Sequence, residues 1–391
     1  MRPFDLLVVG AGPAGSSAAI LLARAGRSVC VVEKAMFPRR KVCGEHISGA
    51  AWPLLEELGV ADRVNERAGP EVRRVGLFSG DVVLDAPMPG VADWPSGRAI
   101  GREHLDTILL ERARACGAVV MRPWSVSAIR AQGDAIECTV EGRDETRHVL
   151  ARTVIGAHGA WEAGNLPTQP ARASAGPREL LGFKAHLRGA RLDGDLMPLV
   201  VFPGGYGGLV WSDAGRVSFS CCVRREALAA ARARRPALRA GDALLDHALC
   251  ANRGMRDALA AAEVDGAWLS AGPIRPAIRK FHEGGMIAIG NAAGEAHPIV
   301  AEGISMAIQS AFLLCEALPD ARRYEAAWRR NFAARVHAAA LFARVLMHPL
   351  AGRAAVGLLA ALPAALTFGA HWSGKDLALL RGVAPSATGS Q

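Results

Sequence analysis

The most restrictive feature of this 391-residue chain is a glycine-rich turn close to its N-terminus. Gly10, Gly12 and Gly15 follow the short apolar run 4–9 and precede an Ala/Leu-rich segment that ends at Gly26. A buried strand, a glycine turn and a helix in this order predict the first half of a βαβ unit. The first glycine permits a tight turn, the second lets a pyrophosphate approach the backbone, and the third lets helix and strand pack closely.

The second strand of this unit, residues 28–32, is followed directly by Glu33. A carboxylate at this point can accept hydrogen bonds from both ribose hydroxyls, and it would repel a 2′-phosphate. The ligand is therefore expected to contain an unphosphorylated adenosine ribose, as FAD and NAD do. A glycine-rich turn that binds no nucleotide is the alternative.

A second small-residue turn follows the apolar run 286–290 and begins with Asn291. Pro298 comes next, and a helix is expected to begin near Gly303. Free N–H groups and the positive dipole end of that helix suit a group that becomes anionic, such as the N1–C2=O edge of a reduced flavin. A protein that binds only NAD has no need of this second site. The pattern therefore favours FAD, with an ordinary strand-to-helix turn as the alternative.

Arg102 is the third element, at the start of a helix expected over 103–115. Arginine suits phosphate and ribose oxygens, although a solvated charge at a helix end is the plainer interpretation. In their order and separation, the three segments resemble the FAD-dependent monooxygenase superfamily, whose archetype is para-hydroxybenzoate hydroxylase. The loop 37–45, with the sequence FPRRKVCGE, resembles the geranylgeranyl-reductase-like branch of that superfamily.

The resemblance implies a set of residues that hold FAD. Along the pyrophosphate, the adenosine and the ribityl chain, they are Gly10, Gly12, Gly15, Glu33, Lys34, Arg102, Val126 and Asn291. Along the isoalloxazine ring they are Cys43, Gly44, Pro298, Gly303 and Ile304.

Two positions depart from the family pattern. His158 stands where the family has the Asp of an Asp-Gly pair near the nicotinamide junction, and Asn291 stands where it usually has another Asp. Asn291 can still hydrogen-bond hydroxyl groups, so FAD binding is expected to survive. His158 puts direct reduction by NAD(P)H in question, and an external flavin reductase is the alternative donor. The Trp-x-Trp-x-Ile-Pro motif of tryptophan-type halogenases is absent from the sequence, so halogenation is not expected.

Three residues near the expected flavin are candidate proton donors or acceptors: Glu45, His46 and His297. A structural or solvated role is the alternative for each. Cys43 lies in a basic loop that would favour a thiolate, and a small residue packed against the flavin is the plainer interpretation.

The strand-like runs at 72–78, 82–86 and 180–223 interrupt the segments assigned to the nucleotide unit. We therefore predict an α/β protein with a discontinuous, Rossmann-like FAD-binding domain over 1–71, 101–162 and 271–320. An antiparallel β-sheet substrate domain, over 72–100 and 175–270, is inserted into it, and a helical region covers 321–391. The candidate apolar lining of the substrate site is Phe183, Val201, Leu209, Trp211 and Phe219.

Composition and charge add limits to this interpretation. Hydrophobic residues make up 51% and charged residues 21%, which excludes a disordered chain. The net charge of +9 favours anionic ligands or an anionic membrane surface, and no nucleic-acid partner is expected. The eight Cys include no CxxC pair and no zinc spacing, so a reducing compartment is expected. A cleaved secretory signal would destroy the first glycine motif, so the predicted location is cytoplasmic.

The segment 354–370 contains no charged residue and is interrupted by Pro363. Core or lid helices are one interpretation, and a peripheral membrane contact is the other, because the segment is too short to span a bilayer.

The resulting prediction is an FAD-dependent monooxygenase of secondary metabolism, with NADPH as a candidate donor. The family resemblance implies that a flavin C4a-hydroperoxide would hydroxylate or epoxidise an aromatic or lipophilic small molecule. A reductase or desaturase of isoprenoid-like double bonds and a non-catalytic flavoprotein are the alternatives.

Overall fold

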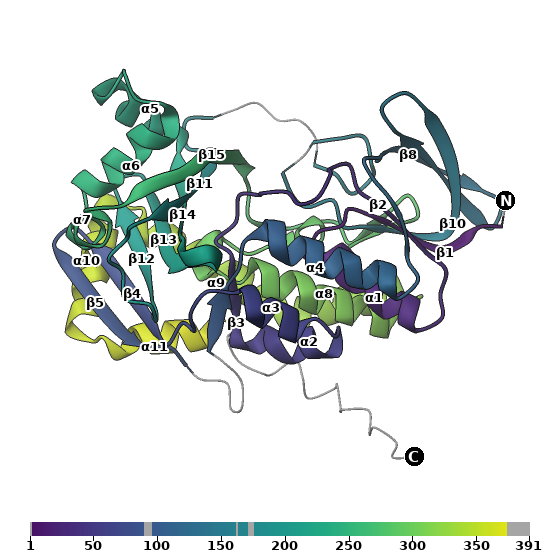
Figure 1. Ribbon diagram of the computed structural model, residues 1–391, viewed down its shortest axis with the longest axis horizontal. Helices are drawn as coiled ribbons and strands as arrows, with labels where there is room; N and C mark the ends of the chain where they lie inside the picture. The colour runs from purple at the N-terminus through teal and green to yellow at the C-terminus, as the bar shows by residue number, and fades with distance from the viewer. Residues whose placement is uncertain (1, 90–95, 162, 171–175, 374–391) are drawn as a thin grey trace, which may run out of the picture.

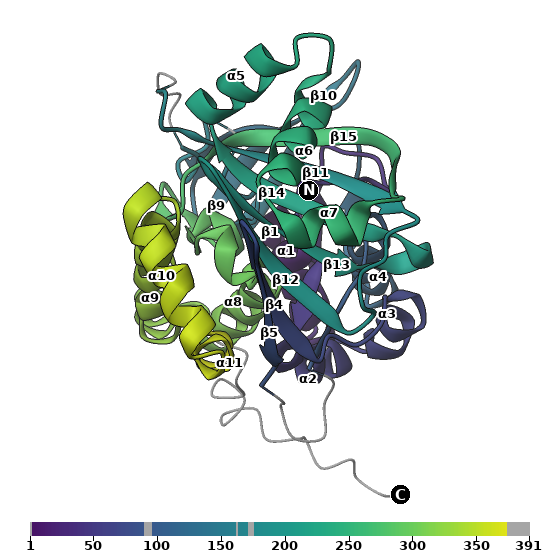
Figure 2. The ribbon, with the colours of Figure 1, turned by 90° about the vertical axis from the view of Figure 1, so that its left-hand side faces the viewer.

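The structure is a computed structural model that describes residues 2–89, 96–161, 163–170 and 176–373. Its two large sheets contain eight and seven strands and lie at opposite ends of the molecule (Figure 1). A group of helices lies between them, and a further set of helices covers one side of the second sheet (Figure 2). The predicted α/β class, with a parallel sheet and a second, mainly antiparallel sheet, is confirmed.

The first sheet is built around five parallel strands. Their order is β18 (Met286–Ala288), β10 (Thr146–Gly156), β1 (Phe4–Val9), β2 (Val29–Val32) and β7 (Val119–Met121). Antiparallel pairs add β17 (His282–Glu283), β9 (Ala135–Glu141) and β8 (Ser125–Gln132). Alternate residues of β1 belong to two hydrophobic clusters, Leu6 and Val8 to one and Leu7 and Val9 to the other. Both faces of this strand are buried, which explains its continuous apolar sequence.

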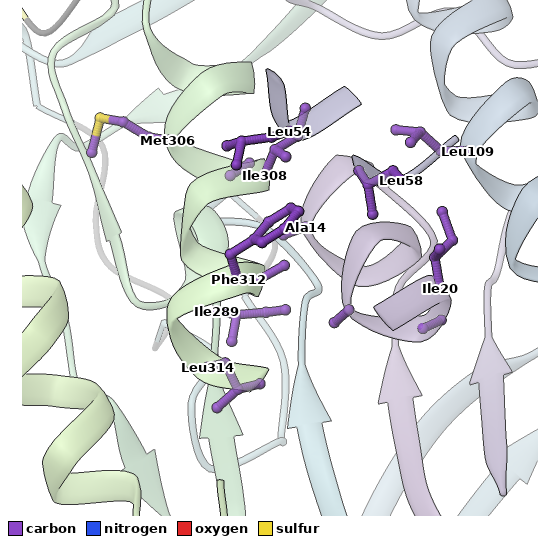
Figure 3. Close-up of a cluster of buried hydrophobic side chains, with 14 of the residues drawn as sticks. Ala14, Ile20, Leu54, Leu58, Leu109, Ile289, Met306, Ile308, Phe312 and Leu314 are labelled. Atoms are coloured by element: carbon purple, nitrogen blue, oxygen red, sulfur yellow. The ribbon is translucent and has the colours of Figure 1, made fainter. Parts of the chain in front are cut away.

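Three helices pack together over one face of this sheet: α1 (Pro13–Arg24), α4 (Arg102–Ala115) and α8 (Gly303–Ala317). Figure 3 shows Phe312 of α8 beside Ala14 of α1, and Ile20 on the side of α1 that faces Leu109 of α4. The shorter helices α2 (Trp52–Glu57) and α3 (Ala61–Arg67) pack beside them. The predicted helices near 50–58, 103–115 and 303 are therefore present.

The second sheet has the order β15 (Glu263–Ile274), β11 (Leu180–Arg188), β14 (Val217–Arg224), β13 (Gly205–Trp211), β12 (Leu196–Phe202), β4 (Arg74–Ser79) and β5 (Val82–Pro87). All its neighbouring strands are antiparallel except β4 and β12, which run parallel because β4 arrives from the first unit and not through a hairpin. Small two-stranded pairs join β3 (His46–Ser48) to β6 (Gly97–Ala99) and β16 (Ala277–Ile278) to β19 (Gly294–Glu295).

The long strand β15 was not predicted, and its sequence explains why. It is an edge strand, all but one of its residues are exposed or half-buried, and it contains Gly266 and the pair Gly272–Pro273, which are turn signals. It also runs across the predicted boundary between residues 270 and 271, and the division into domains stays a prediction. The sequence of residues 224–262 predicts short helices broken at Pro236 and Gly254, and the structure has α5 (Arg225–Arg234), α6 (Ala240–Cys250) and α7 (Arg253–Leu259) there. Gly254 lies inside α7 and is not a break, because the side chain of Asn252 caps that helix one residue before its start.

The C-terminal helices are α9 (Ala321–Leu346), α10 (Pro349–Ala361) and α11 (Ala364–Trp372). They lie together along one side of the molecule (Figure 2). The predicted helical region extends to 391, and its last part, 374–391, lies outside the described residues. Within the described residues no single helix meets the length and hydropathy needed to span a membrane, and α10 and α11 meet it only as a pair bent by 112°.

Gly15 should be essential for folding, because a Cβ atom there would lie 1.9 Å from the carbonyl oxygen of Gly10. We expect Gly15→Ala to be insoluble or to unfold at much lower temperature than the wild type in a thermal melt. Gly357→Ala in α10 is the matched control, because a Cβ there meets no atom within 4 Å. It should be neutral or stabilising by up to about 1 kcal/mol, the helix propensity difference. Equal melting temperatures of the two variants would contradict the packing argument.

Candidate active site

A cavity of about 540 Å³ lies where the carboxyl ends of the parallel strands meet the second sheet, with α8 to α11 contributing to its wall. Ligands of open α/β sheets bind outside this edge. Of the predicted site residues, the cavity is lined by Gly12, Cys43, Gly44, Glu45, His46, Arg102, Asn291, His297, Pro298, Gly303 and Ile304. Among the described residues, its lining does not include Gly10, Gly15, Glu33, Lys34 and Val126.

Glu33 lies at the end of β2 and is almost fully buried. Its Oε2 atom accepts a hydrogen bond of 2.8 Å from the N–H of Ala11, and its Oε1 atom accepts one of 2.9 Å from Ala35. The neighbouring Lys34 is exposed. The N–H of Trp124 donates to the carbonyl oxygen of Glu33, which brings the start of β8, with Val126, to the same end of the site. This carboxylate is therefore held beside the glycine turn, as the adenosine-ribose prediction requires.

Three cationic side chains gather beside the N-terminus of α1. Arg102 is buried and forms two hydrogen bonds to Asp106, of 2.8 and 2.9 Å. Arg39 lies 3.3 Å from Asp106 and 3.6 Å from Glu33. Burial and the nearby charges of Arg102 and Arg39 lower the pKa of Lys41 to about 8. Cations around a helix N-terminus favour an anionic group such as a pyrophosphate.

Two helix N-termini open at this cavity without a side-chain cap. The N-cap of α1 is Gly12, where a Cβ atom would meet only Arg102, at 3.7 Å. At Gly303, the first residue of α8, a Cβ atom would meet nothing within 4 Å. The carboxylate of Glu302 does not cap α8, and it accepts a hydrogen bond of 3.0 Å from Ser48. Backbone N–H groups of both helices are therefore open to a ligand.

These observations fit FAD. The uncapped start of α1 with Arg102 suits the pyrophosphate, Glu33 suits the ribose, and the start of α8 suits the pyrimidine edge of the flavin. The predicted residues at Cys43, Gly44 and Pro298 lie along the wall between these two helix starts and the second sheet. The residues present would therefore hold FAD in this cavity.

Glu45 is fully buried and its backbone has a positive φ of 65°. Its carboxylate accepts hydrogen bonds from Lys184, from His186 (2.8 Å) and from Ser212 (3.1 Å). Burial alone would raise the pKa of Glu45, but the hydrogen bond from His186 and the charge of Lys184 lower it well below its ordinary value. Glu45 is therefore a permanent anion within a network, which weakens the prediction that it exchanges protons with a substrate.

The same network determines the tautomer of His186. Arg40 lies 3.0 Å from Nδ1 of His186 and can only donate, so Nδ1 accepts this hydrogen bond. A neutral His186 then carries its proton on Nε2, where it is donated to Glu45. The network connects the loop 37–46 of the first unit to β11 of the second sheet.

His297 and Tyr206 form the other polar pair in the cavity, with 2.6 Å between the tyrosine oxygen and Nδ1. Burial lowers the pKa of His297 to about 4, so the imidazole is neutral at pH 7. Burial raises the pKa of Tyr206 well above its usual value, so its hydroxyl keeps its proton. A neutral donor and a neutral acceptor therefore face the cavity. His46, in contrast, packs on β6, where a Cβ on Gly97 would lie 2.5 Å from its Nε2 atom.

The two departures from the family pattern also have partners. His158 interacts through Nε2 with the hydroxyl of Thr168 (2.8 Å) and through Nδ1 with the carbonyl of Gly159 (2.9 Å). The side-chain amide of Asn291 donates to Glu295, at 2.9 Å. Both residues line the cavity, and both can offer polar atoms to FAD.

The predicted apolar lining was largely wrong. Phe183 and Phe219 do not line the cavity and pack in one cluster with residues of α6 and α7. Leu209 is among the lining residues, although it pairs with Phe219 across β13 and β14 and belongs to the same cluster. Val201 packs against Leu346, and Trp211 lies beside the Phe183 cluster. Strand residues alternate between faces, and the sequence did not show which face α5 to α7 cover. The observed apolar lining from the second sheet is Val75, Met197, Leu199, Leu209, Val210 and Ile274.

Sequence reasoning also missed Lys184, His186 and Tyr206. Lys184 and His186 are two residues apart on a strand and so share one face, in an otherwise apolar run. This pattern signals a buried polar partner, but it does not identify Glu45, which is 139 residues away from Lys184.

Residues 4–185 match a family model described as an FAD binding domain. A menaquinone reductase of Mycolicibacterium smegmatis is 41% identical over 117 residues, which are 30% of this chain and 28% of that relative. The digeranylgeranylglycerophospholipid reductase 2 of Methanopyrus kandleri is 27% identical over 354 residues, covering 84% of this chain and 83% of that protein. The structure of PqsL from Pseudomonas aeruginosa, described as a probable FAD-dependent monooxygenase, aligns with a TM-score of 0.70 and 19% identity over 91% of this chain and 99% of its own.

The glycine turn with its acidic ribose partner and the two uncapped helix starts are the features of an FAD-binding protein, in agreement with the family match. Residues 4–185 are an FAD binding domain, and the fold as a whole is similar to that of the probable FAD-dependent monooxygenase PqsL. FAD is its cofactor.

The pyrophosphate assignment predicts that Gly12→Val folds but does not retain flavin, because its side chain occupies the ligand's space and meets little protein. Glu33→Ala should also lose most of its flavin. The measurement is the ratio of flavin to protein absorbance after reconstitution with FAD. Gly176→Ala, where a Cβ meets no atom within 4 Å, is the control and should bind normally. Full flavin content in Gly12→Val would refute the assignment.

Replacing Glu45 with Gln should destabilise the protein by about 3 kcal/mol, because Lys184 becomes an unpaired buried charge. The pKa of Glu45 is lowered in the folded state, so its stabilisation is complete above pH about 4.3, the ordinary pKa of Glu. Acidification below that value removes the stabilisation progressively, down to the lowered pKa of the folded state, so the difference in free energy of unfolding between variant and wild type should shrink over this range. Denaturant unfolding at pH 7 and at about pH 2.5 measures this effect. Glu45→Gln with Lys184→Met should recover part of the loss, and no recovery would contradict the charge argument.

Proposed function

We propose that this protein is a monooxygenase that uses FAD to oxygenate a lipophilic compound with an aromatic hydroxyl group. The observation that supports this best is the cavity itself. Its wall beyond the flavin residues is mainly apolar, and Tyr206 and His297 form a neutral donor–acceptor pair within it; Ser220, Glu295 and Ser373 also line the cavity.

The apolar part of the cavity supports a substrate with a long or bulky hydrophobic body. The second sheet contributes Met197, Leu199 and Ile274, and the C-terminal helices contribute Phe342 and Leu366. A substrate that covers these side chains removes their surface from water, which stabilises the complex by about 25 cal/mol for each Å². A charged substrate would gain little from this wall.

The Tyr206–His297 pair favours a substrate that carries one hydroxyl group at the end near the flavin. The neutral imidazole of His297 can accept the proton of Tyr206, whose oxygen can in turn take the proton of a phenol. Loss of that proton makes the aromatic ring electron-rich, and an electron-rich ring reacts more readily with an electrophilic oxygen. The role of the chain is thus to bind the body of the substrate, direct its hydroxyl to Tyr206 and exclude water.

Bound FAD would supply the redox chemistry, by taking electrons from a donor and activating O₂. The donor is proposed to be NAD(P)H, or an external flavin reductase if His158 does not permit nicotinamide binding.

A second candidate is reduction of an isoprenoid-like double bond. It is supported by the archaeal reductase that aligns over most of both chains. It is also supported by Tyr206, whose raised pKa keeps a proton available for donation to a substrate carbon. In this reaction O₂ is not consumed.

The two candidates are separated by isotopically labelled O₂. The purified flavoprotein is incubated with NADPH, or with NADPH and a flavin reductase, together with long-chain alkylphenols or prenylated quinones. Mass spectrometry should detect one labelled oxygen atom in the product. The alternative outcome is a product that has gained two hydrogen atoms and no oxygen, and that also forms under anaerobic conditions. That product would show that the reaction is a reduction and not an oxygenation. Absence of any product with intact flavin turnover would refute both.

Tyr206→Phe should lower kcat about 100-fold with little change in KM or flavin content, because it removes proton transfer but preserves the ring. His297→Gln should cause a smaller loss, since an amide can accept a hydrogen bond. In the wild type, protonation of His297 should reduce kcat as the pH falls towards 4, and not near 6.5. The chain contains a second tyrosine, Tyr324, which bonds to Ser310 in the main core. Tyr324→Phe is therefore the matched control and should leave kcat unchanged.

A further inference from the structure

The C-terminal helices expose an unusual amount of apolar surface. Seven of the eleven large apolar side chains that are exposed in the described part of the chain fall within residues 341–372. We define the C-terminal apolar surface by five of these, four on α10 and α11 and one, Leu362, at the C-cap of α10; their exposed fractions are 48–72%. They are Leu350, Leu358, Leu362, Phe368 and Trp372. Single exposed apolar residues are common on protein surfaces, but a group of them on neighbouring segments marks an interaction site.

The charge of this region is of one sign. Residues 326–373 contain five arginines and no aspartate or glutamate. Arg344 and Arg353 are exposed beside the C-terminal apolar surface. Asp85 lines the groove under α11, and it is paired with Arg74. An apolar surface bordered by arginine complements a membrane with anionic headgroups.

The geometry favours contact along a membrane plane. α10 has 13 residues and α11 has nine, and the two are bent by 112°. A helix needs about 20 residues to cross a bilayer, and each of these two helices is shorter. Short helices with apolar and basic residues lie in the interface between headgroups and acyl chains.

The same helices form the mouth of the active-site cavity. Phe342, Phe368 and Trp372 line the cavity and are also exposed, with 38%, 69% and 48% of their surface accessible. Leu366 and Ala370 line it from the inner side of α11. An opening with apolar side chains therefore leads from the C-terminal apolar surface towards the Tyr206–His297 pair.

We infer that the C-terminal apolar surface binds to an anionic lipid bilayer and that the substrate enters the cavity directly from the bilayer. The binding is independent of the reaction, whereas the entry route rests on the proposed function. A second copy of this chain is a less suitable occupant. A two-fold contact through this surface would bring Arg344 and Arg353 near their own copies with no carboxylate to pair them.

The binding is tested by co-sedimentation of the holoprotein with vesicles of phosphatidylglycerol and phosphatidylcholine, or of phosphatidylcholine alone. The wild type should bind the anionic vesicles more strongly, and salt should weaken this binding. Leu358→Asp with Leu362→Asp should lower the bound fraction about ten-fold. Neither residue lines the cavity, so flavin content should be unchanged. Leu238→Asp with Val119→Asp, at exposed apolar residues elsewhere, is the matched control and should bind as the wild type does.

Arg344→Glu with Arg353→Glu provides a second test that does not disturb apolar packing. It should remove the preference for anionic vesicles and leave the melting temperature unchanged. The inference is overturned if the wild type binds neither vesicle, or if both variant pairs bind as the wild type does. It is also overturned if sedimentation shows a dimer in solution that Leu358→Asp with Leu362→Asp dissociates.

Turnover separates this inference from the proposed function. The Leu358→Asp, Leu362→Asp variant should keep the kcat of the wild type on a short-chain, water-soluble phenol and lose at least about ten-fold on a long-chain phenol embedded in vesicles. Equal loss on both substrates would overturn the entry route. If no phenol is turned over by any variant while vesicle binding behaves as expected, the proposed reaction fails and the membrane surface stands.

Discussion

The buried charge of Glu45 is the interaction on which the active site of this protein most depends. A carboxylate without water is costly unless it is paired and hydrogen-bonded. Lys184, His186 and Ser212 satisfy it, and all three belong to the second sheet or the turn that follows it. The backbone of Glu45 also accepts a hydrogen bond from Ile100, next to the start of α4. One carboxylate therefore fixes the flavin-facing loop against both units of the chain.

This arrangement has a consequence for Cys43 and Gly44, which directly precede Glu45 and line the cavity. The N–H of Glu45 donates to the sulfur of Cys43, at 3.4 Å, and Gly44 lies against Ser220 of β14. The position of the loop is thus set by hydrogen bonds and contacts within the chain itself. Glu45 acts as a positioning residue, and the available proton chemistry shifts to the neutral pair Tyr206–His297.

The sequence predicted the parts of the fold that are encoded locally. The glycine turn, Glu33 and the helix start at Gly303 each lie within one strand-to-helix unit, where spacing and residue type determine the conformation. Contacts between residues that are far apart in the sequence could not be predicted in this way. The partners of Glu45 are brought close only by the pairing of β11 in the second sheet, and β15 was hidden by its glycines and proline. The wrong choice of lining residues has the same origin, because either face of an apolar strand satisfies the sequence pattern.

The apolar wall of the cavity and the exposed apolar side chains of the C-terminal helices have one physical cause, which is the need to keep apolar surface away from water. A cavity that binds a hydrophobic body needs an apolar path to it, and a path that opened into water would expose that apolar wall. Here the path opens beneath Phe368 and Trp372, on helices that expose apolar side chains outward as well as inward. Such helices gain stability if their outer side also leaves water. A membrane-bound state therefore buries the outer face of α10 and α11 and gives the inner face access to substrates that dissolve in lipid.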